Sequence, residues 1–230
     1  MDYQNKTRRI LKDVGAFVDG GHFVYNSGHH GDFYINKDAL YVYPKKLDDI
    51  CVMLTAVAVE QFNDDFDVVL APAIAGIILG QNVAYNISLE RSRNIFFAYA
   101  DKHLSNEQYR TIRRGYGQVV KNKKVLLVDD IVSTGSTLVS MAQAVMQLGG
   151  EVVGAAVICD RGHVRNLKCS IDSSKDIFNI PIAPLVELDL QTFKADNCPL
   201  CRAGRPIDME LGEGGSIDLF QQVKKVQEDV

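Results

Sequence analysis

The stretch from Val125 to Thr137 constrains the fold of this chain more than any other segment. Four apolar residues, Val125–Val128, are followed by two adjacent acids, Asp129 and Asp130, and then by small hydroxyl residues around one glycine. Apolar residues then recur at helical spacing. A strand, a short loop and a helix in this order indicate parallel β-structure. Ligands of such sheets bind beyond the carboxyl ends of the strands, so we expect a ligand site directly after this strand.

The same alternation continues along the chain and predicts an α/β fold, a parallel sheet of about five strands flanked by helices with a small hood. We divide the chain into an N-terminal helix and hood (1–43), a core (44–190) and a C-terminal tail (191–230). The predicted helices are Pro44–Phe62, Ile74–Leu89 and Leu138–Leu148. The predicted strands are Phe66–Leu70, Ile95–Tyr99, Lys124–Val128, Val152–Cys159 and Ile182–Val186. A short helix at Ile217–Val226 is given no role.

Composition excludes several classes of function. The formal net charge is −4, which gives no footprint for nucleic acid or for an anionic membrane. The N-terminus is polar where a signal peptide needs an apolar core, and no apolar run reaches the length of a membrane span. Five scattered cysteines are typical of reduced thiols. We therefore expect a cytoplasmic protein with small-molecule partners, and neither nucleic acid nor a membrane among its ligands.

The loop after the acids has the chemistry of a phosphate site. Backbone N–H groups at a helix N-terminus, together with hydroxyl side chains, form a nest for an anion. Asp129 and Asp130 would repel that anion, but they can accept hydrogen bonds from sugar hydroxyls or hold a cation. A phosphate nest beside two diol-binding acids describes a site for a sugar 5-phosphate.

This segment resembles the 5-phosphoribosyl 1-pyrophosphate signature of type I phosphoribosyltransferases. The resemblance implies the fold of that family, a Mg²⁺ cofactor and a homodimer. It also implies that Asp129 and Asp130 are catalytic, that they hold the ribose hydroxyls, and that they meet the metal indirectly, through the Mg-bound ribose donor. The residues implied to bind the ribose 5-phosphate are Ser133, Thr134, Gly135, Ser136 and Thr137.

Two further segments resemble the pyrophosphate-binding parts of the orotate phosphoribosyltransferases. One is the loop formed by Ala73, Ile74, Ala75 and Gly76, whose small residues let backbone amides approach an anion. The other is the polar segment Asp101–Gly117, which stands where the family has a flexible catalytic loop. The resemblance implies that Lys102, near the start of this segment, is a catalytic cation that faces pyrophosphate. It also implies that Arg113 and Arg114, near the end of the segment, are pyrophosphate-binding cations. This loop lacks the denser Arg and Lys run of better-known orotate enzymes. The identity of the cation that assists the leaving group therefore stays open. An alternative interpretation is that this segment is an exposed hairpin with solvated charges.

The base-contacting residues implied by the resemblance are Ser27, Phe33, Tyr34 and Arg161. Phe33 and Tyr34 would stack on a planar heterocycle, and the Arg161 guanidinium suits the carboxylate of orotate. Simpler alternatives are that the aromatic pair alternates along a strand and that Arg161 lies solvated in its loop.

The favoured function is therefore transfer of the phosphoribosyl group from 5-phosphoribosyl 1-pyrophosphate to orotate, giving orotidine 5′-phosphate and pyrophosphate. One alternative is a 6-oxopurine phosphoribosyltransferase of purine salvage. Another is a non-catalytic sensor of the ribose donor, although the chain shows no helix-turn-helix region and is acidic. An Asp-Asp phosphoacceptor domain would explain only the acid pair.

The histidines and cysteines present a second possible site. His22, His29 and His30 are close in sequence but lack the fixed spacing of a zinc site, which favours polar loop contacts. Cys198-Pro-Leu-Cys201 has the spacing of half a zinc ribbon, and the sequence shows no second half. A free reduced pair is the favoured interpretation, and the sequence leaves metal binding open.

Overall fold

The structure is a computed structural model that describes residues 2–25, 28–106, 109–170, 177–209 and 211. The chain forms two compact units. The first consists essentially of residues 47–188, and the second joins residues 4–46 to the residues from 189 onward. The predicted helix at Ile217–Val226 and the proposed base contact Ser27 lie outside the described residues.

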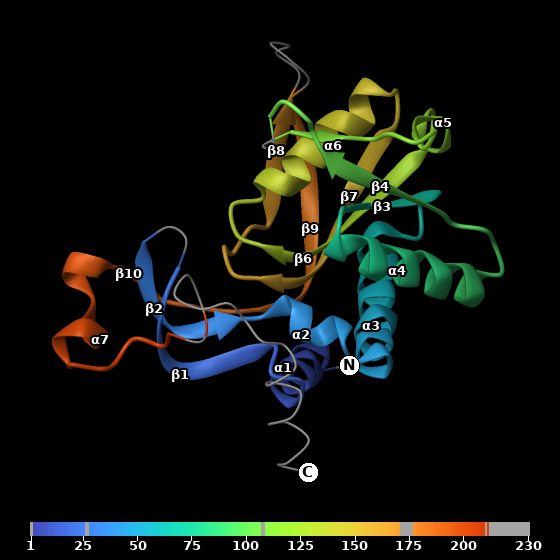
Figure 1. Cartoon of the computed structure of the whole chain (residues 1–230). Helices are drawn as coiled ribbons and strands as arrows, with labels where there is room; N and C mark the ends of the chain where they lie inside the picture. The colour runs from blue at the N-terminus through green and yellow to red at the C-terminus, as the bar shows by residue number, and fades with distance from the viewer. Residues whose placement is uncertain (1, 26–27, 107–108, 171–176, 210, 212–230) are drawn as a thin grey trace. The chain divides into compact units, whose positions relative to one another are not determined.

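The described residues of the first unit form a seven-stranded sheet with the order β5-β4-β3-β6-β7-β9-β8 (Figure 1). The five central strands are parallel, whereas β5 and β8 run antiparallel at the two edges. This confirms the α/β fold with about five parallel strands, and it adds two edge strands that the sequence did not predict. The strands are β3 (Val68–Pro72), β4 (Phe96–Lys102), β5 (Arg110–Thr111), β6 (Lys124–Val132), β7 (Glu151–Asp160), β8 (Asn166–Ser170) and β9 (Ile177–Glu187).

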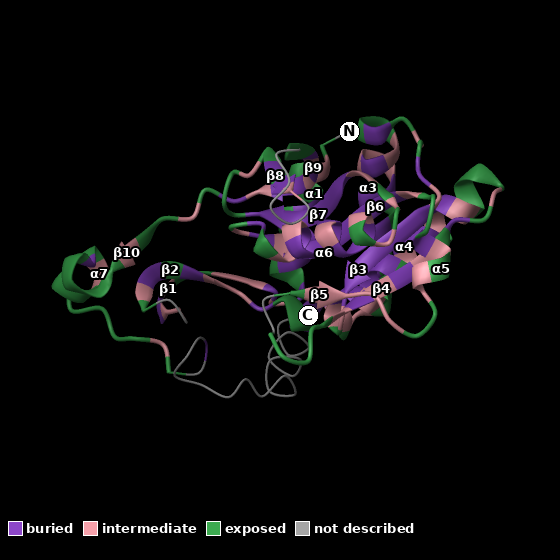
Figure 2. Ribbon diagram, turned by 90° about the horizontal axis from the view of Figure 1, so that it is seen from above, coloured by how far each residue is buried: buried purple, intermediate pink, exposed green. Residues whose placement is uncertain are grey.

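Helices cover both faces of this sheet and therefore bury its strands on both sides, as in most parallel sheets. Leu70 of β3 belongs to the same buried cluster as Met141 of α6. The next residue, Ala71, faces α4 instead: a Cβ added at Gly80 would lie 2.7 Å from the Ala71 Cβ. Successive strand residues point to opposite faces, so α4 and α6 lie on opposite sides. Figure 2 shows the buried strands in purple. The helices are α3 (Pro44–Phe62), α4 (Ala75–Arg91), α5 (Gly117–Val120) and α6 (Ser136–Gln147).

The second unit contains a three-stranded antiparallel sheet with the order β1-β2-β10. Its β10 follows the first unit in the chain and pairs with β2, so segments from both ends of the sequence share one sheet. Phe33 of β2 is buried against Tyr25, with ring centroids 5.6 Å apart. The elements are α1 (Tyr3–Asp13), β1 (Phe17–Val24), β2 (His29–Ile35), α2 (Lys37–Tyr41), β10 (Thr192–Lys194), a 3-10 turn (Ala195–Asn197) and α7 (Pro199–Arg202).

Local sequence signals agree with most element bounds. The predicted helix Pro44–Phe62 is found with those bounds, because proline suits the first turn and apolar residues follow at helical spacing. The predicted strand at Lys124–Val128 continues through both acids to Val132. Part of Asp101–Gly117 is ordered as the end of β4 and as β5. Within the described part of the chain, no helix has both the length and the apolar character to cross a membrane.

Candidate active site at the carboxyl ends of the parallel strands

Asp129 and Asp130 lie near the carboxyl end of β6, in the middle of the parallel sheet. Their exposed fractions are only 7% and 5%. The Asp130 backbone N–H donates a hydrogen bond of 2.9 Å to Asp129 Oδ1. A carboxylate that is largely removed from water is costly unless donors or a cation surround it. The pair is therefore suited to accept hydrogen bonds from a diol or to sit beside a divalent cation.

The loop that follows the acids turns sharply into α6. Gly135 has φ of +78°, in the left-handed region, and precedes the first residue of the helix. A Cβ added there would lie 2.3 Å from Leu167 Cδ2, so the loop requires glycine for its backbone conformation and for space. Thr134 Oγ1 donates to Ser136 Oγ at 3.3 Å, and both side chains are exposed. The loop thus presents hydroxyls and the N-terminal amides of a twelve-residue helix to solvent.

The loop after β7 is held directly against the loop after β6. The Arg161 N–H donates to the Val132 carbonyl at 3.0 Å. The Gly162 N–H donates to Asp160 Oδ1 at 2.9 Å, which closes the turn. A Cβ added at Gly162 would lie 1.8 Å from the Ser133 carbonyl oxygen, so only glycine allows this approach. The structure therefore brings Arg161 next to the predicted phosphate loop. Sequence analysis assigned no role to Asp160 or Gly162, although both flank Arg161 in the chain.

The predicted pyrophosphate loop lies at the same edge of the sheet. It connects β3, which pairs with β6, to the N-terminus of α4. Ile74 is 86% exposed, and the peptide bond between Ala73 and Ile74 is cis. A Cβ added at Gly76 would lie 2.7 Å from Pro72 Cδ, so the chain turns tightly here. Since side chains are small or directed to solvent, the loop presents its backbone to a ligand.

The predicted catalytic cations lie on and after β4. Lys102 ends β4 and pairs with Arg110, two residues beyond the last β3–β4 pair, so it lies at the carboxyl edge of the sheet. Arg113 is half-buried, whereas Arg114 is exposed with its Nε 3.9 Å from Asp101 Oδ2. All three cations therefore lie on or shortly after the strand that pairs with β3.

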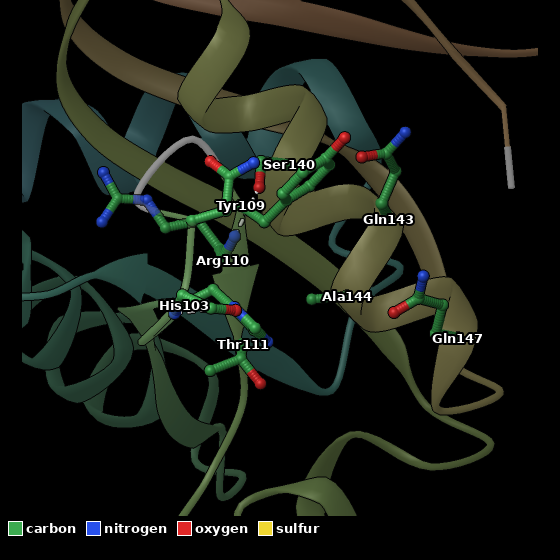
Figure 3. Close-up of a pocket in the computed structure, with 10 residues that line it drawn as sticks. His103, Tyr109, Arg110, Thr111, Ser140, Gln143, Ala144 and Gln147 are labelled. Carbon is green, nitrogen blue, oxygen red and sulfur yellow. Dashed lines mark hydrogen bonds between the residues drawn. The ribbon is translucent and has the colours of Figure 1, made fainter. Parts of the chain in front are cut away.

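A cavity lies beside this segment and is separate from the predicted phosphate site. Its volume is about 650 Å³, and it lies between the β4–β5 segment and the outer side of α6 (Figure 3). The Arg110 N–H donates to Ser140 Oγ at 2.6 Å beside it. None of the residues Asp129–Thr137 lines it. The lining residues are His103, Ser105, Asn106, Tyr109, Arg110, Thr111, Ser140, Gln143, Ala144 and Gln147.

The aromatic pair of the predicted base site lies in the second unit, on β2. Phe33 is 3% exposed and packs on Tyr25, whose hydroxyl donates to the Phe33 carbonyl at 2.6 Å. Tyr34 is half-buried, with its ring 5.7 Å from that of Phe23. The two residues alternate along the strand, so they point to opposite faces. Of the pair, Tyr34 is the one with ring surface exposed for a ligand.

The fold and the strand-end site together define a class of protein. A family model of the phosphoribosyl transferase domain matches residues 45–185. The chain belongs to this family, as its resemblance predicted, and the α/β fold of the family is confirmed.

Curated relatives narrow the comparison further. The chain is 33% identical over 199 residues to the orotate phosphoribosyltransferase of Campylobacter jejuni (strain 81-176), covering 85% of this chain and 93% of the relative. It is 32% identical over 191 residues to the orotate phosphoribosyltransferase of Caldanaerobacter subterraneus, covering 83% and 88%.

Solved structures show the same fold. The orotate phosphoribosyltransferase of Aeropyrum pernix superposes with a TM-score of 0.57 at 19% identity, covering 78% of this chain and 92% of that one. Adenine phosphoribosyltransferase of Saccharomyces cerevisiae also gives 0.57, at 15% identity, covering 79% and 99%. The fold is therefore shared by enzymes named for different bases, and it does not select a base.

Proposed function

We propose that this chain transfers the 5-phosphoribosyl group of 5-phosphoribosyl 1-pyrophosphate to orotate, with release of pyrophosphate. The observation that carries the proposal is the strand-end arrangement at β6 and β7. There, two shielded acids, a phosphate loop and Arg161 are brought together by backbone contacts. The identity to curated orotate phosphoribosyltransferases over most of the chain supports the choice of base.

The ribose donor is bound from two directions. The amides and hydroxyls of Ser133–Thr137 hold the 5-phosphate at the positive end of α6. Asp129 and Asp130 accept hydrogen bonds from the ribose hydroxyls, which fixes the orientation of the ring. Positioning of this kind can contribute about 7–11 kcal/mol to lowering a two-substrate barrier.

The departing pyrophosphate is bound by a second group of residues, apart from the loop that holds the 5-phosphate. A base nitrogen loses its proton to solvent and forms the new bond to the anomeric carbon. The bond from that carbon to pyrophosphate oxygen breaks, and its electrons leave with pyrophosphate. The backbone of residues 73–76 binds the leaving group, and Lys102, Arg113 and Arg114 offset its charge. The shielded oxygens of Asp129 and Asp130 fit the neighbourhood of a hard divalent cation. When bound with the donor, Mg²⁺ supplies further positive charge for the departing pyrophosphate.

The base is recognised by its carboxylate and its ring. The exposed Arg161 side chain presents a guanidinium fork to the orotate carboxylate, and Tyr34 offers an aromatic face. We further propose a homodimer in the cytoplasm. Cys51, Cys159 and Cys169 form no disulfides, which fits a reducing compartment. Sedimentation of the purified protein would establish its oligomeric state.

The test is pyrophosphate release from the ribose donor and Mg²⁺ with orotate, uracil, hypoxanthine, guanine, xanthine or adenine. Release with orotate alone is the expected result. Release with hypoxanthine or guanine would favour the 6-oxopurine alternative. Binding of the donor without release for any base would favour a sensor.

A matched pair of variants tests the role of Arg161. Loss of hydrogen bonds to a charged group costs about 1.5–3 kcal/mol, so Arg161→Gln should lower kcat/KM for orotate roughly 10- to 150-fold. The KM for the ribose donor should not change. Arg165 lies in the same loop but pairs with Glu187 at 2.8 Å, so Arg165→Gln serves as the control. Equal effects of the two substitutions would exclude a specific contact between Arg161 and the base.

A further inference from the structure

Four metal-binding side chains meet in the second unit, outside the proposed active site. His22 of β1, His30 of β2, and Cys198 and Cys201 at α7 each offer one ligand atom, and these atoms all lie within 4.8 Å of one another. His22, His30 and Cys198 are buried, whereas Cys201 is exposed. The two cysteines are not joined by a disulfide. None of these four residues takes part in the proposed catalysis.

The fold brings these residues together although more than 160 residues separate the two pairs in the sequence. His22 and His30 lie on the paired strands β1 and β2, whose pairing register shifts between Asp19 and Phe23. β10 then pairs with β2 and places Phe193 opposite His30. The chain then passes through the 3-10 turn Ala195–Asn197 into α7, which begins after Cys198. The histidines are therefore the second half of the site that the cysteine spacing alone lacked.

The distances among the ligand atoms fit a tetrahedral zinc ion. His22 Nε2 lies 3.0 Å from His30 Nδ1, 3.7 Å from Cys198 Sγ and 3.6 Å from Cys201 Sγ. Cys201 Sγ lies 3.3 Å from His30 Nδ1. Zinc–nitrogen and zinc–sulfur bonds of about 2.1 and 2.3 Å place neighbouring tetrahedral ligands roughly 3.3–3.8 Å apart. A single ion at the centre would therefore reach all four atoms with small adjustments.

The orientation of His22 adds an independent indication. Its Nδ1 lies 2.8 Å from the carbonyl oxygen of Arg205, which can only accept a hydrogen bond. Nδ1 therefore carries a proton, which leaves Nε2 as the nitrogen that can bind a metal, and Nε2 faces the other ligand atoms. A backbone carbonyl that fixes the tautomer of a histidine in this way is typical of metal ligands. Two thiolates and two neutral imidazoles also balance the charge of a divalent ion in a mostly buried site.

We propose that His22, His30, Cys198 and Cys201 bind one structural Zn²⁺. Two sulfur and two nitrogen ligands in tetrahedral arrangement select zinc over magnesium or calcium, which prefer oxygen. Four protein ligands leave no position for a substrate, so the ion stabilises structure and takes no part in the chemistry. Zinc binding at this site does not depend on which base the enzyme uses.

The ion explains how this small unit holds together. β10 has three residues and α7 has four, and neither length is stable without further support. Zinc would connect the C-terminal segment, which contains β10 and α7, to both strands of the β1–β2 hairpin. Two other contacts join the same segments: the Asp208 N–H donates to the His22 carbonyl at 2.8 Å, and Arg205 Nη1 donates to the Gly21 carbonyl at 3.2 Å. Removal of the metal should loosen all of them together.

The first experiment is metal analysis of the full chain, purified without a polyhistidine tag and dialysed against a weak chelator. Plasma mass spectrometry should find about one zinc per chain. A second measurement needs no variant: cobalt added to the metal-free protein should give the intense visible bands of tetrahedral Co²⁺ and a thiolate-to-cobalt charge-transfer band. Metal-free protein that stays colourless with cobalt would overturn the proposal, as would a Cys198–Cys201 disulfide in protein purified without reductant.

Matched variants locate the site. Cys201 is exposed, so Cys201→Ser removes a ligand without opening a cavity. We expect Cys201→Ser and His30→Asn to weaken zinc binding at least about 100-fold in competition with a chromogenic chelator, which exceeds the usual effect of changing an outer-shell partner. His29→Asn, one residue away but outside the cluster, should bind zinc like the unmodified chain. Zinc retained by both ligand variants would place the ion elsewhere and refute the assignment.

Discussion

The contact between Gly162 and Ser133 gives a prediction whose magnitude follows from the structure. In Gly162→Ala the new Cβ would lie 1.8 Å from the Ser133 carbonyl oxygen, whereas carbon–oxygen contacts are normally about 3.3 Å or longer. The neighbouring atom belongs to the backbone and cannot rotate away, so one of the two loops must shift by about 1.5 Å. A misplacement of about 1 Å can lower a rate 100-fold. We therefore expect kcat/KM for the ribose donor to fall by about two orders of magnitude.

The free energy of unfolding should also decrease. Overpacking of this kind costs about 1–3 kcal/mol, which corresponds to a melting temperature lower by roughly 2–12 °C in a chain of this size. Pyrophosphate release measures the kinetic effect, titration calorimetry measures donor binding, and scanning calorimetry measures the melting temperature.

Gly149→Ala is the matched control. Gly149 has φ of +79°, and the nearest atom to an added Cβ is 3.9 Å away, so the substitution introduces backbone strain without a clash. It should cost about 1–2 kcal/mol of stability and leave kcat/KM unchanged. If Gly162→Ala loses stability like the control but binds and converts the donor normally, the close approach of the two loops does not position the phosphate site.

Three further results are expected. Lys102→Ala should leave donor binding intact and lower single-turnover rates about 100-fold, as loss of one charge-stabilising group does; an unchanged rate would remove Lys102 from catalysis. Tyr34→Ala should weaken orotate binding about 2- to 10-fold through lost aromatic contact, while a larger loss of donor affinity would contradict its assignment to the base. Burial raises the pKa of the Cys51 thiol to about 12 from 9.0, so near pH 9 it stays protonated and unreactive. Iodoacetamide should then label Cys201 after zinc removal but not Cys51, and peptide mass spectrometry distinguishes the two; labelling of Cys51 in the folded chain would show that it is not buried.

Sequence signals predicted those parts of the site that depend on neighbouring residues. The strand, acids, glycine and hydroxyls of β6 and its loop are consecutive, so their order alone indicated the arrangement. The bounds of helix α3 were also predicted correctly, because its proline and its apolar residues lie within one short stretch of sequence. Arg161 was selected by resemblance, and its backbone contact with Val132 follows from the pairing of β6 with β7.

Features that depend on distant residues were not predicted. Gly162 gives no sign in the sequence that it approaches Ser133, because that distance is set by two loops on different strands. The edge strands β8 and β10 are short, with five and three residues, and in β8 only Leu167 and Cys169 mark the alternation of a strand. His22 and His30 likewise come close to the two cysteines only when β10 pairs with β2.

The pairing of β10 with β2 also sets an order of events during synthesis on the ribosome. Residues 4–46 emerge first, but the strand that completes their sheet begins only at Thr192, about 146 residues later. At 5–20 residues per second the early hairpin waits roughly 7–30 s for its third strand. An isolated hairpin is at best marginally stable in water. The intervening residues 47–188 can fold as a unit during that interval. The part of the chain made first is therefore among the last to reach its final structure, and its exposed strand edges depend on prompt completion of the C-terminus.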